Sequence, residues 1–160
     1  MSLRFIIDGY NVIRHRSFPI NITGKTTPHH ALLSYIRNNR LCGSAKNRVT
    51  VVLDGFGSAG RRSPLMPAAE IIYSEEESAD ERIKRIVEES GNPRNLVVVS
   101  DDREIRFFVR SKGARVLKVE DFVNPRRLRI VSKEEPAKPE LSSEEVSFLN
   151  EELKGLWLKE

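Results

Sequence analysis

Short apolar segments alternate with amphipathic ones along most of the chain. Five of them are rich in β-branched and other apolar residues, with little alternation, as is typical of strands buried on both faces of a parallel sheet. They are residues 3–8, 48–54, 69–74, 95–100 and 114–119. Between them lie stretches whose apolar residues recur every three or four positions, as on one face of a helix. The pattern predicts an α/β domain with a mostly parallel, five-stranded central sheet.

Helix signals separate several of these strands. Residues 26–43 and 101–113 carry helical apolar stripes that end at a glycine. Residues 78–90 are the clearest helix, because Ser78 and Glu81 have the spacing of a capping box. We therefore predict three main helices that cover the sheet.

Other segments lack both patterns. Residues 9–25 and 55–67 are punctuated by Gly, Pro, Asn or Ser and are predicted to be long loops, which often carry function. Residues 124–140 are charged and contain prolines, so we expect a linker or an extended arm. Residues 141–157 have the apolar stripe of an amphipathic helix.

Composition fits a domain of ordinary size. The chain has 160 residues, 39% of them hydrophobic, which is enough for one core, expected over residues 1–123, with the arm and helix over 124–160. No apolar run is long enough to span a membrane, and the first residues do not resemble a signal peptide. Cys42 is the only cysteine, so no internal disulfide can form. We expect a cytoplasmic protein without membrane contact.

Charge is distributed unevenly. Residues 1–62 hold ten Lys and Arg against only Asp8 and Asp54, a net charge of +8, whereas residues 63–160 carry −4. A basic half of this kind attracts a polyanion such as RNA, although a solvated basic surface that aids solubility would look the same.

Aspartates follow the predicted strands at their carboxyl ends. Asp8 closes the first strand and Asp54 the second, each followed by glycine. Either could be a simple Asp-Gly turn, but ligands of open parallel sheets bind at these strand ends. Asp101 and Asp102 follow the fourth strand, where a helix N-cap is the ordinary role of one of them. We favour Asp101 as a ligand, with Asp102 supporting it or acting as a second ligand.

Asp80 has the best independent geometric argument. It lies three and seven positions before Ile83 and Val87, so it shares the helix face that points to the core. A favourable charge at the helix N-terminus explains an acid in the first turn, but not one on the buried face.

Grouped carboxylates repel one another unless a cation lies between them, and Mg²⁺ and Mn²⁺ prefer carboxylate oxygens. One or two such ions activate water for phosphodiester cleavage. No His or Cys cluster suggests another metal. Candidates for substrate binding are Asn11 and the arginines in the loops after the first two strands, which are Arg14, Arg16, Arg61 and Arg62.

Four motifs occur in an order that resembles a known family. IIDGYNVI, VVLDG, the run from EIIYS to SADERIKRIV, and VVVSDD followed by GARVL resemble the YacP-like NYN domains of the PIN-like nuclease superfamily, over roughly residues 3–123. The resemblance implies a PIN-like three-layer sandwich, metal-dependent endoribonuclease activity and a link to RNA decay. It matches Asp8, Asp80 and Asp101 to the family's acids, Asn11 to its D-G-Y-N motif, and Asp54 to an acid of related nucleases.

The leading hypothesis is therefore a metal-dependent endoribonuclease. Asp8, Asp80 and Asp101 would be catalytic, and Asp54 and Asp102 would join them in binding Mg²⁺ or Mn²⁺. The partner is RNA, most simply single-stranded mRNA, and the family adds the ribosome. The alternatives are a non-catalytic RNA- or ribosome-binding module that keeps the acids, and a flap-type DNase, for which the chain leaves little room.

Overall fold

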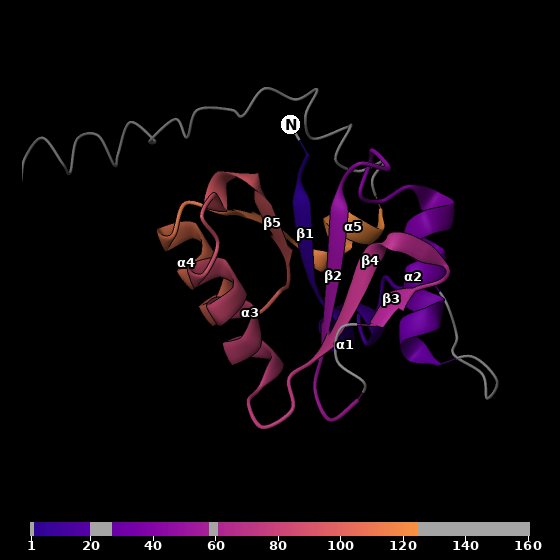
Figure 1. Ribbon diagram of the computed structural model, residues 1–160, viewed down its shortest axis with the longest axis horizontal. Coiled ribbons are helices and arrows are strands. Elements are labelled where there is room, and N and C mark those ends of the chain that lie inside the picture. Colours follow the sequence, from indigo (N-terminus) through magenta and orange to yellow (C-terminus); the bar gives the residue numbers. More distant parts are fainter. Residues whose placement is uncertain (1, 20–26, 58–60, 125–160) are drawn as a thin grey trace, which may run out of the picture. The chain divides into compact units, whose positions relative to one another are not determined.

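The computed structural model describes residues 2–19, 27–57 and 61–124. Within them, six strands form one sheet in the order β3-β4-β2-β1-β5-β6 (Figure 1). Their bounds are β1 Arg4–Asp8, β2 Arg48–Leu53, β3 Arg61–Ser63, β4 Met66–Tyr73, β5 Leu96–Val99 and β6 Arg115–Leu117. Five of the strands are parallel, which confirms the predicted central sheet.

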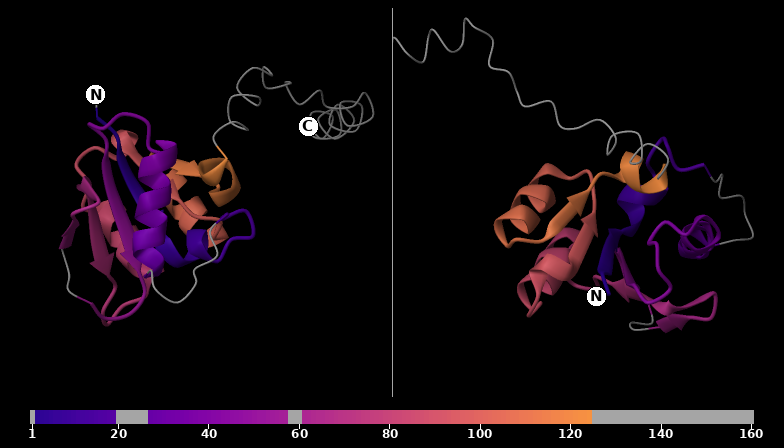
Figure 2. Two further views of the ribbon diagram at one scale, coloured as in Figure 1. Left: turned by 90° about the vertical axis from the view of Figure 1, so that its right-hand side faces the viewer. Right: turned by 90° about the horizontal axis from the view of Figure 1, so that it is seen from above.

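Helices cover both faces of this sheet. Their bounds are α1 Gly9–Ile13, α2 Pro28–Asn39, α3 Ala79–Glu88, α4 Arg103–Ser111 and α5 Val119–Val123, and a 3-10 turn, η1, spans Pro93–Asn95. Figures 1 and 2 show α3 and α4 on one side of the sheet and α2 on the other. The arrangement is the predicted three-layer α/β sandwich.

The strands supply side chains to two cores because neighbouring residues of a strand face opposite sides of the sheet. On β1, Ile7 joins the cluster with Leu32 of α2, whereas Ile6 joins the cluster with Ile83 of α3 and Ile105 of α4. All five side chains are at most 1% exposed. Burial on both faces explains why the strands read as continuous apolar runs rather than as alternating ones.

Two elements lie in segments predicted to be loops. Residues 9–13 form α1, with Asp8 as its N-cap, and residues 61–63 form β3, which pairs antiparallel with β4. Gly9 permits the close approach of α1 to β2, since a Cβ there would lie 2.4 Å from Leu53 Cδ2. β3 is a three-residue edge strand without an apolar run, so hydrophobic patterning does not reveal it.

Helix α3 begins as the sequence predicts. Ser78 is its N-cap, and the hydrogen bonds of the capping box with Glu81 run in both directions, at 3.2 and 3.1 Å. The predicted arm and C-terminal helix, residues 124–140 and 141–157, lie outside the described residues apart from residue 124. In the part of the chain that the structure describes, no helix is long and apolar enough to cross a membrane.

A candidate active site at the carboxyl ends of the strands

The parallel register brings the carboxyl ends of β1, β2 and β5 to one edge of the sheet, at the bottom of Figure 1. Asp8 is the last residue of β1 and is only 6% exposed. Its Oδ1 accepts a hydrogen bond from the backbone N–H of Asn11 at 3.3 Å, and its Oδ2 accepts one from the Ser100 hydroxyl at 3.1 Å. The Asp8 carboxyl group is therefore held in a fixed position.

The environment of Asp8 disfavours its negative charge. Burial raises its pKa from 3.8 to about 6, although the hydrogen bonds from Asn11 and Ser100 lower it. The charges of Asp80 and Asp54 also raise this pKa, so both carboxylates lie near enough to act on Asp8. Burial and the neighbouring acids thus both disfavour the charged form of Asp8.

Asp54 connects the end of β2 to the start of α3. It is exposed, and its Oδ1 accepts a hydrogen bond of 2.7 Å from the backbone N–H of Ala79, the first residue of the helix. Asp80 is the next residue, and its carboxylate lies near enough to those of Asp8 and Asp54 to interact with them electrostatically. The chain segment after β2 thus fixes where the helix acid lies.

Asp80 is half-buried, as expected for a residue on the face of Ile83 and Val87. Its pKa is raised, first by burial and then by the charge of Asp102, whereas the charge of Lys84 lowers it. Lys84 forms an ion pair with Glu104 of α4, which holds its ammonium group near the acids. The sequence pattern does not reveal this influence of Lys84 on Asp80.

The two aspartates after β5 have different surroundings. Asp102 is the N-cap of α4, and its Oδ1 accepts hydrogen bonds from the backbone N–H groups of Glu104 and Ile105, at 2.8 and 3.0 Å. Among the acids that raise the pKa of Asp80, Asp102 has the largest effect, ahead of Asp54 and Glu104. Asp8, Asp54, Asp80 and Asp102 are therefore linked by their electrostatics, and we call these four the acid cluster.

Asp101 makes other contacts. Its Oδ1 accepts a hydrogen bond of 3.0 Å from the backbone N–H of Val119, and its Oδ2 lies 3.2 Å from His15 Nε2. His15 Nδ1 accepts a hydrogen bond from the backbone N–H of Ser17, so the ring proton is on Nε2 and is donated to Asp101. The Asp101 carboxylate thus joins the segment after α1 to the start of α5.

Asn11 and Ser100 support this edge of the sheet. Asn11 Oδ1 accepts a hydrogen bond of 3.2 Å from the backbone N–H of Asp101, in addition to the bond from its own N–H to Asp8. Ser100 is fully buried, and while its hydroxyl donates to Asp8 it accepts from the backbone N–H of Asp102 at 3.1 Å. Local sequence patterns do not predict this role of Ser100 between two acids.

The structure describes the side chains of two of the four arginines that we predict to bind substrate. Arg14 is exposed, and its guanidinium carbon lies 4.9 Å from the centre of the Tyr10 ring, a cation–π geometry. Arg16 is also exposed. The side chains of Arg61 and Arg62 lie outside the described residues.

The acid cluster fits a hard divalent cation by its chemistry. Its members offer only carboxylate oxygens, and burial together with the neighbouring acids raises the pKa of Asp8 and that of Asp80. Over residues 2–19, 27–57 and 61–124, no three His, Cys, Asp or Glu side chains already meet closely enough to hold a metal ion. Binding of a metal ion would therefore bring the carboxylates of the acid cluster closer together.

A parallel α/β sandwich with acids at the carboxyl ends of its strands is the arrangement of a PIN-like nuclease domain. A sequence profile of the YacP-like NYN domain matches residues 5–155, beyond the segment that carries the sequence resemblance. The chain therefore belongs to the YacP-like NYN domain family, which supports an RNase-type function.

Solved structures agree with this assignment. The W164L mutant of Rae1 (YacP) from Bacillus subtilis matches with a TM-score of 0.58 and 21% identity, over 85% of this chain and 87% of that one. Another crystal structure of Rae1 (YacP) from Bacillus subtilis gives 0.51 and 22%, over 98% and 92%. At this identity the likeness shows the fold. No curated protein matches the chain.

Proposed function

We propose that this protein is a metal-dependent endoribonuclease that cleaves single-stranded RNA at the acid cluster. The observation that carries the proposal is the electrostatic link between Asp8, Asp54, Asp80 and Asp102, which come from four separate segments of the chain. Family membership supports the same reading, since NYN domains of the nuclease type generally use divalent metal ions.

Each acidic residue would have a distinct role at the metal ion. Asp8 and Asp80 would be the central ligands of Mg²⁺ or Mn²⁺, with Asp54 and Asp102 beside them. We place Asp102 ahead of Asp101, the aspartate that the sequence favours, because Asp101 is bonded to His15 and to the Val119 N–H. When bound, the ion would activate water and stabilise the leaving oxygen of the phosphodiester. Ser100 holds the Asp8 carboxyl group in place.

Basic side chains near the same edge would bind the RNA backbone. Arg14 and Arg16 follow α1, and both are exposed. Contacts of this kind add affinity that falls with salt and carry little sequence preference. We therefore assign these arginines to RNA affinity rather than to the chemical step.

The test is cleavage of single-stranded RNA by the purified protein in Mn²⁺ and in EDTA. We expect cleavage in Mn²⁺ only, and a loss of more than about 100-fold in Asp80→Asn, because even residues that merely support a metal ligand cost 10- to 100-fold. Glu81→Gln is the matched control, since it changes an acid of the same turn and a Gln at this position still serves a capping box. Cleavage that survives both EDTA and Asp80→Asn would refute the mechanism.

One observation favours a second candidate, a non-catalytic RNA- or ribosome-binding module. Asp8 and Asp102 are helix N-caps, and Asp54 accepts from the first N–H of α3, so helix capping alone explains three of the acids. Such a module would bind RNA equally well in Mn²⁺ and in EDTA and would not cleave it.

A further inference from the structure

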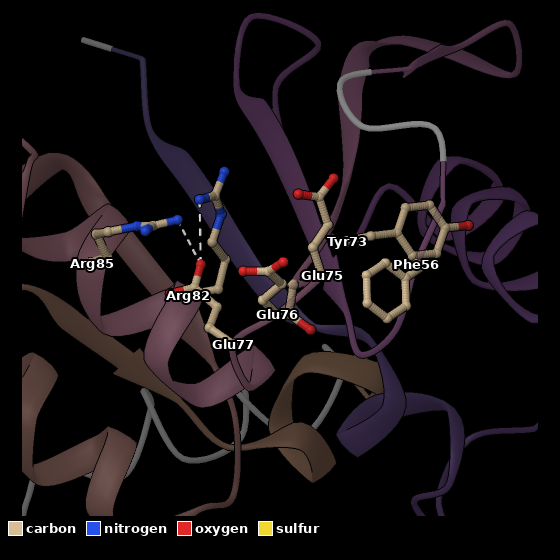
Figure 3. A pocket seen from close by; sticks show the side chains of 8 residues that line it. Phe56, Tyr73, Glu75, Glu76, Glu77, Arg82 and Arg85 are labelled. Atoms are coloured by element: carbon tan, nitrogen blue, oxygen red, sulfur yellow. Dashed lines mark hydrogen bonds and ion pairs between the residues drawn. The ribbon is translucent and has the colours of Figure 1, made fainter.

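A pocket of about 490 Å³ opens at the carboxyl ends of β2 and β4, and Arg82 and Arg85 of α3 also line it. Its size is that of a site for a small molecule or a single base. Figure 3 shows the rings of Phe56 and Tyr73 on one side, the guanidinium groups of Arg82 and Arg85 on the other, and Glu75 between them. The proposed chemistry at the acids does not use this pocket.

Backbone hydrogen bonds join the segment after β2 to the turn after β4 on the aromatic side of the pocket. The N–H of Ser74 donates to Leu53 O at 2.9 Å, and the N–H of Glu75 donates to Gly55 O at 3.0 Å. Glu75 has a positive φ of 59°, the left-handed region, so the chain turns sharply after β4. The segment after β2 and the turn after β4 therefore form one preorganised side of the pocket, opposite Arg82 and Arg85.

Phe56 is the main reason to assign this pocket to a base. Its side chain is 80% exposed, and in the described part of the chain the only other large apolar side chain so exposed is Phe107. The Tyr73 ring packs against the same segment, since a Cβ on Gly57 would lie 2.3 Å from Tyr73 Cε2. Exposed aromatic rings are the surfaces on which unpaired RNA bases stack.

The polar groups of the pocket include both donors and acceptors. Glu77 Oε1 accepts from Arg82 Nη1 at 3.3 Å and from Arg85 Nη2 at 2.5 Å, so one carboxylate holds both guanidinium groups. The buried Nε of Arg82 has no hydrogen-bond partner among the described residues. The structure likewise shows no hydrogen bond or ion pair, within the residues it describes, for the exposed carboxylates of Glu75 and Glu76.

We propose that this pocket binds an unpaired guanine next to the cleavage site, an inference that rests on the proposed function because it takes RNA as the substrate. Guanine alone among the four bases offers two neighbouring donors, N1–H and N2–H₂, to a carboxylate such as Glu75 or Glu76. Its O6 and N7 are the acceptors to which arginine most often binds. Stacking on Phe56 would supply affinity, and these polar contacts would supply the preference.

The position of the pocket relative to the acids fits this role. Phe56 follows Asp54 by two residues, so the two backbone positions are at most about 7 Å apart. A base in the pocket would therefore hold a neighbouring phosphate close to the acid cluster.

The test measures binding in EDTA by fluorescence anisotropy, with labelled oligouridylate and the same oligomer carrying one central guanine. We expect tighter binding of the guanine-containing RNA, and a loss of roughly five- to 150-fold for it in Phe56→Ala, the range of base–aromatic stacking. Phe56→Trp should keep the affinity. Phe107→Ala is the matched control, because it removes an equally exposed ring from α4 and should leave binding unchanged.

A double variant, Glu75→Gln with Glu76→Gln, tests the preference and should bring the two oligomers to similar affinity. Equal binding of both oligomers by the wild-type protein, or equal losses in Phe56→Ala and Phe107→Ala, would overturn the inference even if Mn²⁺-dependent cleavage is found. A guanine preference that depends on Phe56 in a protein that never cleaves RNA would support the pocket and refute the nuclease instead.

Discussion

At the scale of single residues, Asp8 is the most constrained side chain of the site. It is buried, and its pKa of about 6 in the folded chain compares with 3.8 for an exposed Asp. Folding therefore takes up a proton between these pH values, so the free energy of unfolding falls as the pH rises from about 4 to about 6. Above that range Asp8 is ionised in the folded protein, and the free energy of unfolding is lowered by the full cost of that buried charge.

Asp8→Asn should accordingly stabilise the metal-free protein at neutral pH. Two pKa units correspond to about 3 kcal/mol, which is the upper limit of the gain. The measurement is urea unfolding in EDTA across this pH range, where the difference between wild type and variant isolates Asp8 because Asp80 titrates in both. A difference that does not grow with pH would contradict the assigned pKa.

Ser100 should contribute to the stability of the fold through its two buried hydrogen bonds. Ser100→Ala removes the donor to Asp8 and the acceptor for the Asp102 N–H, both at a buried position, and should cost about 1–3 kcal/mol in the free energy of unfolding at pH 7.5. Ser111→Ala is the control, because it removes a hydroxyl that bonds a carbonyl at the exposed end of α4. Similar small losses in both variants, measured by urea unfolding, would show that Ser100 does not organise the acids.

At this scale the sequence predicts which face of its helix carries Asp80, whereas local spacing does not choose between Asp101 and Asp102. The face of Asp80 follows from helical spacing to Ile83 and Val87, which is a local property. Whether Asp101 or Asp102 faces the other acids depends on which of them caps α4 and on the position of His15, which belongs to another part of the chain.

At the scale of elements, the continuous apolar strands and the capped helix α3 are predictable because each carries a strong local signal. α1 and β3 have five and three residues, too few for a periodic pattern, and their contacts with β2 and β4 decide their structure. α1 directly follows Asp8, and β3 contains Arg61 and Arg62, so local patterning fails at elements that carry predicted site residues.

The capping box of α3 should stabilise the helix that carries Asp80. Ser78→Ala removes the hydrogen bond to the Glu81 N–H and should lower the free energy of unfolding by about 1 kcal/mol, whereas Ser78→Asp should retain most of it. Urea unfolding of both variants measures the effect. Equal losses in the two variants would mean that Asp54, through its bond to Ala79, suffices to begin the helix.

At the scale of the whole molecule, the basic half of the sequence should make RNA binding salt-dependent. For single strands, each phosphate contact contributes about 0.7 to the slope of log affinity against log salt, so Arg14→Ala and Arg16→Ala should each reduce that slope by about this amount. Arg94→Ala is the control, because exposed Arg94 precedes β5 and so lies at the opposite edge of the sheet. An equal change in all three variants would indicate diffuse attraction rather than a binding edge.

The central claim is that the acid cluster binds a divalent cation, and crystals soaked in Mn²⁺ test it most directly. The account predicts an anomalous-scattering peak between the carboxylates of Asp8 and Asp80, within reach of Asp54 and Asp102, and its disappearance in Asp80→Asn. A fully soaked crystal with no peak among these four aspartates, or with a peak that persists in Asp80→Asn, would contradict it.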